Sequence, residues 1–284
     1  MTNNKPTVET RRWTMADGRA IVGDTGGDPA APTVVLMHGG GQTRHSWAGA
    51  VDALLRQGYH VINYDAAGHG DSDWSEVYTL HSRSSDLMTI IEQANGPVAL
   101  VGASLGGATA MRAVAHGYQP AALALVDIVP RPDLRGVKRI RDFMLANSDG
   151  FASLDAVADA IAAYNPHRPR PRDNGGLMRN VRLRDNGRYY WHWDPRILAT
   201  DLDEELKEFE DVVAGLQSAR NVPLLLVRGL ASDVVDDHGI AELTHTMPHM
   251  EIWDVAGAGH MVAGDRNDAF NQGVLDFLSR TMPA

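Results

Sequence analysis

Ser104 lies between two glycines in the stretch VALVGASLGGA, residues 98–108. The apolar, β-favouring start of this stretch ends at Gly102, and small residues with helix-like spacing follow at once. A strand, a tight turn and a helix in this order form a nucleophile elbow, in which glycines let the backbones cross closely while the serine hydroxyl projects. The N-terminus of the following helix supplies unpaired N–H groups, which suit a negatively charged oxygen. We therefore predict that Ser104 is a nucleophile.

A serine hydroxyl is a poor nucleophile until a neighbouring base takes its proton, and a histidine commonly does so. Among the 12 histidines, His260 has the best setting, because it ends the small-residue loop Gly257-Ala258-Gly259-His260 between the last expected strand and the last expected helix. Chemistry in open α/β sheets gathers at the carboxyl ends of the strands. We predict that His260 is the general base.

A carboxylate must orient this histidine. Asp233 is the first choice, because it follows the apolar run PLLLV at 223–227. Asp236 and Asp237 are close enough to be confused with it. Asp127, at the end of the strand after the elbow, is a further rival.

The same chemistry needs two donors for the oxyanion of a tetrahedral intermediate. One is predicted to be the backbone N–H of Leu105, immediately after the nucleophile. The other is expected from the glycine loop that follows the buried run at 33–37. Gly40 is the predicted donor and Gly41 the alternative, because glycine lets a backbone approach the substrate.

Four residues are expected to touch the substrate, with packing as the simpler interpretation of each: Gln42, Trp47, Trp191 and Trp193. A pocket with such aromatic side chains would suit an apolar or aromatic group. His38 and His69 are interpreted as structural histidines rather than catalysts.

The elements that must position these residues alternate along the chain. A hairpin is expected within 8–30. Strands are expected at 33–37, 59–64, before the elbow, 121–126, 223–227 and 250–253, and helices at 45–57, 80–94, after the elbow and at 268–279. This alternation predicts an α/β fold with a parallel sheet.

The alternation lapses between 130 and 218, where helix-like pieces occur at 137–146 and 153–164. We interpret this segment as a helical cap inserted into a core domain of residues 1–129 and 219–284. Residues 131–188 carry more basic than acidic side chains. Such charge runs usually face solvent.

Composition excludes several classes of function. The absence of cysteine removes disulfides, thiolate metal sites and a cysteine nucleophile. A net charge of −10 argues against nucleic acid or an anionic membrane as partner. The chain shows neither zinc-like histidine spacing nor a nucleotide-binding glycine motif, so no metal and no cofactor is expected. The start MTNNKPTVETRRW has no apolar signal segment, which favours a cytoplasmic enzyme.

Taken together, these motifs resemble the α/β-hydrolase superfamily across nearly the whole chain. The matching pieces are His38-Gly39-Gly40-Gly41, Asp65-Ala66-Ala67-Gly68-His69-Gly70-Asp71-Ser72-Asp73, Gly102-Ala103-Ser104-Leu105-Gly106-Gly107, Arg228-Gly229 with Asp233, and Gly257-Ala258-Gly259-His260. The order Ser, Asp, His along the chain is also that of the family. The resemblance implies a mostly parallel eight-stranded sheet with helices on both faces, a helical lid, a Ser-His-Asp triad and hydrolysis without a cofactor.

Two details refine the resemblance. Serine at 104 separates the chain from epoxide hydrolases and haloalkane dehalogenases, which look similar but carry aspartate there. The turn after Asp65 has Ala66-Ala67 where an arginine or proline is common in the family, which affects the detail of this loop and not the fold.

We expect hydrolysis of a carboxylic ester or lactone, and the aromatic residues of the cap favour an apolar or aromatic small molecule as the substrate. The alternative, with the same triad, is a C–C bond hydrolase of a ring-fission keto acid or a cofactor-free perhydrolase, which the triple glycine and the basic half of the cap would suit. A ligand-binding receptor on a hydrolase fold is a remote alternative. The sequence leaves a homodimer open.

Overall fold

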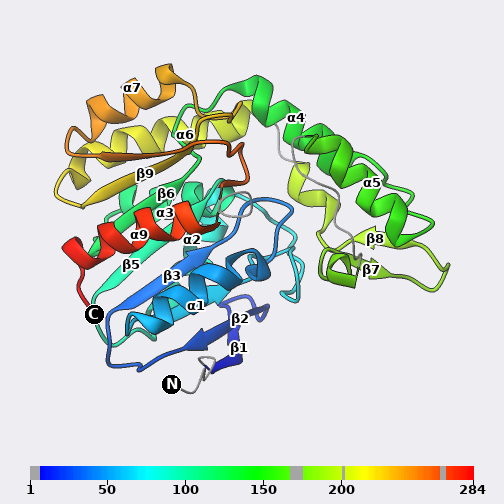
Figure 1. Cartoon of the computed structure of the whole chain (residues 1–284), viewed down its shortest axis with the longest axis horizontal. Helices are drawn as coiled ribbons and strands as arrows, with labels where there is room; N and C mark the ends of the chain where they lie inside the picture. The colour runs from blue at the N-terminus through cyan, green and yellow to red at the C-terminus, as the bar shows by residue number, and fades with distance from the viewer. Residues whose placement is uncertain (1–6, 167–174, 200–201, 263–266) are drawn as a thin grey trace.

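A computed structural model of the chain describes residues 7–166, 175–199, 202–262 and 267–284. An eight-stranded sheet lies at its centre, in the order β1-β2-β4-β3-β5-β6-β9-β10 (Figure 1). The strands are β1 (Val8–Thr14), β2 (Ala20–Gly26), β3 (Thr33–Met37), β4 (His60–Tyr64), β5 (Val98–Ala103), β6 (Ala122–Val126), β9 (Leu224–Gly229) and β10 (Glu251–Val255). The hairpin β1–β2 joins the sheet antiparallel to β4, and all other neighbours are parallel. The expected mostly parallel eight-stranded sheet is confirmed.

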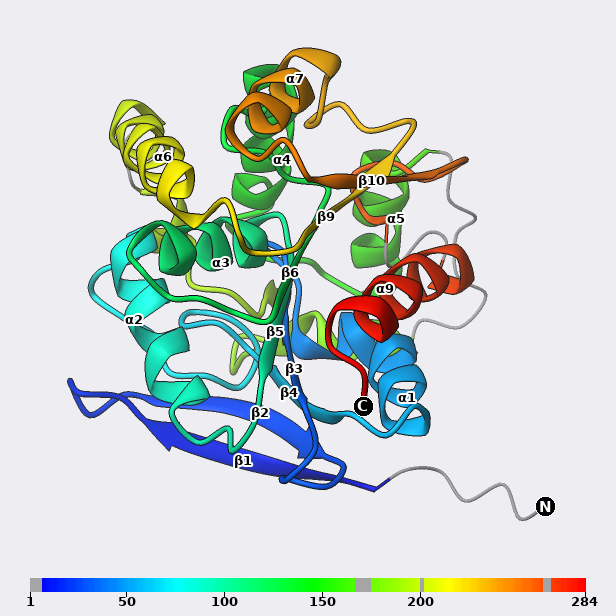
Figure 2. The ribbon, with the colours of Figure 1, turned by 90° about the vertical axis from the view of Figure 1, so that its left-hand side faces the viewer.

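Helices cover both faces of this sheet (Figure 2). One face carries α1 (Ala48–Arg56) and α9 (Asn267–Thr281), and the other carries α2 (Leu80–Ile91), α3 (Leu105–Ala115), α6 (Leu202–Leu216) and α7 (Asp237–Thr246). Successive side chains of a strand point to opposite faces. In β5, Leu100 therefore packs with α2 and α3, while Val101 packs with α1 and α9.

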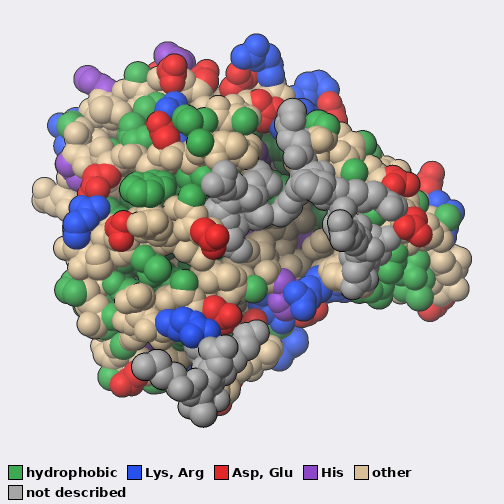
Figure 3. All heavy atoms as spheres, in the orientation of Figure 1, with side chains coloured by type: hydrophobic (Ala, Val, Ile, Leu, Met, Phe, Trp, Pro, Cys, Tyr) green, Lys and Arg blue, Asp and Glu red, His purple; other side chains and the backbone are tan. Residues whose placement is uncertain are grey.

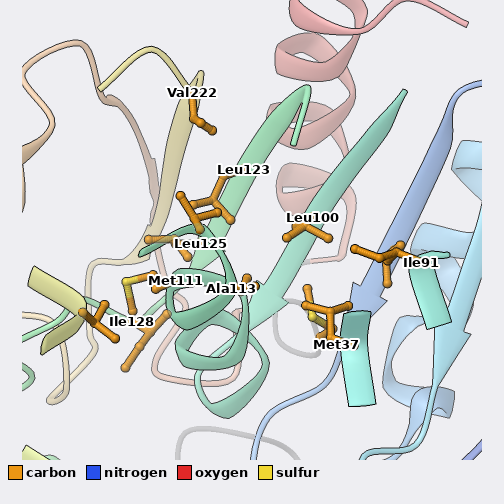
Figure 4. Close-up of a cluster of buried hydrophobic side chains, with 14 of the residues drawn as sticks. Met37, Ile91, Leu100, Met111, Ala113, Leu123, Leu125, Ile128 and Val222 are labelled. Carbon is orange, nitrogen blue, oxygen red and sulfur yellow. The ribbon is translucent and has the colours of Figure 1, made fainter. Parts of the chain in front are cut away.

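The core beneath α3 shows why the central strands are continuous apolar runs (Figure 4). Leu100 of β5, Leu123 and Leu125 of β6 and Met111 of α3 belong to this cluster, and all four side chains are fully buried. A strand with helices on both faces has no side open to water, so both of its faces are apolar. This packing holds the carboxyl ends of β3, β5, β6 and β9 at one edge of the sheet.

Between β6 and β9 the chain leaves the sheet and forms a part that projects from the core, which we call the cap (Figure 1). The cap contains α4 (Leu134–Leu145), α5 (Leu154–Tyr164) and a small hairpin, β7 (Val181–Leu183) with β8 (Tyr189–Trp191). It has a small core of its own, built around Phe151, Val157 and Val181. Short 3₁₀ segments complete the described structure: η1 (Arg44–Trp47), η2 (Gly175–Arg179), η3 (Pro195–Leu198) and η4 (Gln217–Ala219).

The segment 130–218, expected as the cap, does not project over its whole length. Its last helix, α6, packs against α3, and Val212 and Leu216 belong to the main core. The surface is hollowed where the projecting part meets the core (Figure 3). The carboxyl ends of the strands lie beside this junction.

Candidate active site

Ser104 occupies the sharp turn between β5 and α3. Its backbone has φ 45° and ψ −111°, a strained conformation for a residue with a side chain. The neighbouring glycines are sterically required: a Cβ on Gly102 would lie 2.4 Å from the carbonyl carbon of Gly106, and one on Gly106 would lie 2.3 Å from Met37 O. The turn therefore has the geometry of the expected nucleophile elbow.

His260 pairs with Asp127, which directly follows β6. His260 Nδ1 lies 2.7 Å from Asp127 Oδ2, and the carboxylate is fully buried. Asp127 also accepts the Gly229 N–H on Oδ1, at 3.1 Å, and the Ser232 hydroxyl on Oδ2. With three donors around it, the carboxylate is well suited to hold the imidazole in one orientation.

The expectation that Asp233 orients His260 is wrong for this structure. The Asp233 carboxylate forms a two-bond ion pair with Arg139 of α4, with distances of 2.6 and 2.9 Å. The backbone around Asp233 packs so tightly on α4 that a Cβ on Gly136 would lie 2.1 Å from Asp233 O. This contact turns the carboxylate toward the cap helix instead of toward the histidine loop.

The other two rivals have different partners as well. Asp236 caps the N-terminus of α7 by accepting the Gly239 N–H at 2.8 Å. Asp237 is almost fully exposed and pairs with Arg228. Asp127, which the sequence left as a rival, is thus the carboxylate in contact with His260.

Backbone strain singles out the same residue. Within the described ranges, the non-glycine residues with positive φ are Ser104 (45°), Asp127 (51°) and Asn147 (61°). Left-handed conformations of non-glycine residues cost energy and are enriched at functional sites, although Asp and Asn tolerate them best. Sequence reasoning had no access to this signal.

Ser104 and His260 both have contacts at the carboxyl end of β6. The Ser104 backbone N–H donates to Val126 O at 3.0 Å, and the next residue, Asp127, holds His260. In the described part of the chain no hydrogen bond joins the Ser104 hydroxyl to the imidazole, and His260 Nε2 has no partner there. Such bonds are often long in substrate-free enzymes and tighten when substrate binds.

The glycine loop after β3 leaves one N–H group free. Gly39 N–H donates to Gln42 Oε1 and Gly41 N–H donates to His69 Nε2, both at 3.1 Å. Gly40 N–H and Leu105 N–H have no partner among the described residues. The alternative donor, Gly41, is therefore already engaged, and Gly40 with Leu105 is the pair left to hold an oxyanion.

Three buried histidines hold this loop: His38, His69 and His192. Each ring accepts one backbone N–H and has its other nitrogen beside a carbonyl oxygen, so each ring is neutral with a defined tautomer. His38 accepts the Ala66 N–H and lies beside Gly39 O. His69 accepts the Gly41 N–H and lies beside Ala67 O. His192 accepts the Gly70 N–H and lies beside Gly41 O. Successive ring centroids lie 5.1 and 5.9 Å apart.

Burial lowers the pKa of all three histidines. The pKa of His192 falls to about 3, mainly through burial. Burial also lowers the pKa of His38, and it brings the pKa of His69 well below its ordinary value. The electrostatics thus favour the neutral rings that the hydrogen bonds require. The interpretation of His38 and His69 as structural histidines agrees with these contacts.

The residues expected to touch the substrate have different surroundings. Trp193 borders the glycine loop, since a Cβ on Gly41 would lie 3.4 Å from its ring, and it stacks on Trp191 with centroids 4.8 Å apart. Trp47 is fully buried and packs on the Phe270 ring inside the core, so a substrate role for it is wrong for this structure. Gln42 accepts a hydrogen bond within the loop.

Among the described residues, no three His, Asp or Glu side chains are grouped so that they could hold a metal ion. None of the helices in that part of the chain is both long enough and apolar enough to span a membrane.

A mostly parallel α/β sheet with helices on both faces and a tight turn from β5 into α3 is the architecture of the α/β-hydrolase fold. Residues 34–272 match the model of the alpha/beta hydrolase family, and the chain belongs to that family. It is 33% identical over 263 residues to the esterase Rv0045c of Mycobacterium tuberculosis, a match that covers 87% of this chain and 84% of the relative. It is 27% identical to the 3-hydroxybutyrate-oligomer hydrolase of Cupriavidus necator, with coverage of 82% and 84%.

Solved structures show the same architecture. The structure of esterase Rv0045c superimposes with a TM-score of 0.76 at 31% identity and covers 96% of this chain and 93% of that one. E-2-(acetamidomethylene)succinate hydrolase gives a TM-score of 0.82, with 96% and 100% covered, and at 20% identity it shows the fold alone.

Proposed function

We propose that this protein is a serine esterase that hydrolyses carboxylic esters, lactones included, through an acyl-enzyme on Ser104. The observation that carries the proposal is the pairing of His260 with buried Asp127 at the end of β6, where Val126 O accepts the Ser104 N–H. The similarity to the esterase of M. tuberculosis and to the hydroxybutyrate-oligomer hydrolase supports ester hydrolysis.

In this mechanism His260 Nε2 takes the proton from Ser104 Oγ as the oxygen attacks the ester carbonyl carbon. Asp127 accepts the Nδ1–H of His260, which holds the tautomer with Nε2 free and stabilises the imidazolium that forms. The tetrahedral oxyanion accepts the N–H groups of Gly40 and Leu105. Collapse expels the alcohol with the proton from His260. A water molecule, deprotonated by His260, then attacks the acyl-enzyme, and His260 returns that proton to Ser104 Oγ as the carboxylic acid leaves.

The surroundings of the glycine loop favour an apolar or aromatic group on the substrate. Met144 of α4 and Trp193 pack against Gly41, at 3.3 to 3.4 Å from the position of a Cβ there. Trp193 stacks on Trp191, and the Trp191 ring in turn contacts the Phe143 ring, with these two centroids 5.6 Å apart. Apolar side chains with a few directed N–H groups are typical of small-molecule sites.

The test is turnover of p-nitrophenyl acetate, butyrate, octanoate and phenylacetate by the wild type, Ser104→Ala and Ser85→Ala. Loss of the nucleophile typically costs about 10³-fold or more in kcat, so we expect that loss for Ser104→Ala. Ser85→Ala should match the wild type, because Ser85 is exposed on α2 and bonds its own helix. Equal rates for the wild type and Ser104→Ala would contradict the proposal. Faster turnover of a ring-fission keto acid than of every ester would replace ester hydrolysis by C–C bond hydrolysis.

A further inference from the structure

We propose that His192, a residue of the cap, is a positioning residue for the oxyanion hole, so that the hole is complete only when the cap is docked. The inference rests on the proposed function, because it assigns His192 to the hole that Gly40 and Leu105 form. His192 directly follows β8, more than 150 positions after the glycine loop.

The His192 ring bridges two loops of the core. Its Nδ1 accepts the Gly70 N–H at 2.8 Å, and its Nε2 donates to Gly41 O at 3.3 Å. The residue is 3% exposed. One buried side chain of the cap thus joins the glycine loop to the loop that follows β4.

The contact of His192 with Gly41 affects the direction of the free Gly40 N–H group. Gly41 has a φ of 72°, its N–H is held by His69, and its carbonyl group is held by His192. The two peptide planes that flank Gly41 are therefore each fixed by a histidine.

The plane that carries Gly40 N–H comes directly before these two. In a trans peptide the C=O and N–H groups point in opposite directions. Gly39 O accepts His38 Nδ1–H at 2.8 Å and Gln42 N–H at 3.1 Å, which aims Gly40 N–H away from both donors. Without His192, the Gly41 carbonyl group would lose its donor, and the His69 bond to the Gly41 N–H would be the histidine contact that remains on this side of Gly40.

The segment around His192 is seated on the core by further bonds. Asp194 N–H donates to Gly68 O and Arg182 donates to Gly70 O, both at 2.8 Å. The Asp194 carboxylate accepts the Tyr78 hydroxyl at 2.7 Å. The docking bonds made by Tyr78 do not reach Gly41, so docking and loop positioning can be varied separately.

Two substitutions of His192 each keep one of the two hydrogen bonds of its ring. His192→Asn places its amide near the Nδ1 position, where it can accept the Gly70 N–H, but it is too short to reach Gly41 O. His192→Gln places its amide NH₂ near the Nε2 position and can still donate to Gly41 O. Because a lost oxyanion donor costs about 10² to 10³ in kcat, we expect a misaimed one in His192→Asn to cost about 10-fold. We expect KM for p-nitrophenyl butyrate to change less than about threefold, and kcat of His192→Gln to stay within about threefold of the wild type.

Two controls accompany this pair. Tyr78→Phe removes one docking bond and should lower Tm without lowering kcat. His238→Asn changes an exposed histidine of α7, with 75% of its side chain accessible, and should alter neither. A second readout is the affinity for a trifluoromethyl ketone that forms a tetrahedral adduct, which should fall in His192→Asn in proportion to kcat.

Equal kcat in the wild type and folded His192→Asn would overturn the inference, and so would equal losses in His192→Asn and His192→Gln or in Tyr78→Phe. Failure of the proposed function has a different outcome: Ser104→Ala would then retain the activity of the wild type.

Discussion

His260 Nδ1 lies 2.7 Å from Asp127 Oδ2, at the end of the strand next to the elbow and not at the end of the following strand. The carboxylate that the chain carries after β9, Asp233, instead ties cap helix α4 to the core through Arg139. Arg139 also lies over the Tyr164 ring, 4.8 Å from its centroid. Two acidic residues at neighbouring strand ends thus have separate tasks, one at the histidine and one at the cap.

We expect Asp127→Asn to lower kcat by about 10³ to 10⁴, because an amide stabilises the wrong tautomer of the histidine and leaves the imidazolium without its partner charge. Steady-state kinetics on p-nitrophenyl butyrate measures the loss. Asp233→Asn is the matched control and should stay within about threefold of the wild type, since Asp233 has no contact with His260. A larger loss of kcat in Asp233→Asn than in Asp127→Asn would instead identify Asp233 as the acid that orients His260.

The ion pair between Asp233 and Arg139 should contribute little to stability. About two fifths of each side chain is exposed, and exposed pairs contribute about 1 kcal/mol or less. A double-mutant cycle with Asp233→Asn and Arg139→Gln, measured by urea unfolding, should give a coupling free energy below about 1 kcal/mol. A larger coupling would indicate that the bidentate geometry outweighs the exposure.

The buried histidines should make the protein acid-sensitive. Their pKa values are lowered in the folded state, whereas histidine in the unfolded chain titrates near about 6.5, so the unfolded state binds more protons below that pH. Stability is thus complete above about pH 6.5 and falls as the pH decreases, for His192 down to its folded-state pKa of about 3.

Urea unfolding at pH 7.5 and 5.5 measures this dependence. Each buried histidine should lower the free energy of unfolding by on the order of 1 kcal/mol between pH 7.5 and pH 5.5. His192→Gln removes one of them, so its loss of stability should be smaller than that of the wild type by about this amount, whereas His238→Asn should lose as much as the wild type. An unchanged loss in His192→Gln would contradict the lowered pKa.

Gly106→Ala should be severely destabilising. The added Cβ would lie 2.3 Å from Met37 O, and the contact is with backbone that cannot move without displacing β3. Overpacking of this kind costs about 3 kcal/mol. Gly176→Ala, where a Cβ meets nothing within 4 Å, is the control and should leave the free energy of unfolding nearly unchanged. Similar stabilities of the two variants would show that the elbow tolerates a side chain.

The regular part of the fold was predictable because its signals are local. The run at 33–37 is a strand over those residues, and the expected hairpin forms between β1 and β2. The expected helix at 137–146 begins earlier, at Leu134, because Asp133 accepts the Arg135 N–H and caps it. The hairpin β7–β8 and helix α7 were missed, since short or weakly patterned segments acquire their structure from the surfaces they pack on.

Sequence by itself determined the elbow, the glycine loop and the histidine after the last strand, because glycine spacing and an apolar run that ends in a turn restrict the backbone locally. Only the tertiary structure decided which carboxylate serves His260, since several aspartates follow strands and the direction of a side chain depends on what its loop packs against. It also decided that His192 reaches the glycine loop, a contact between distant segments that no local pattern encodes.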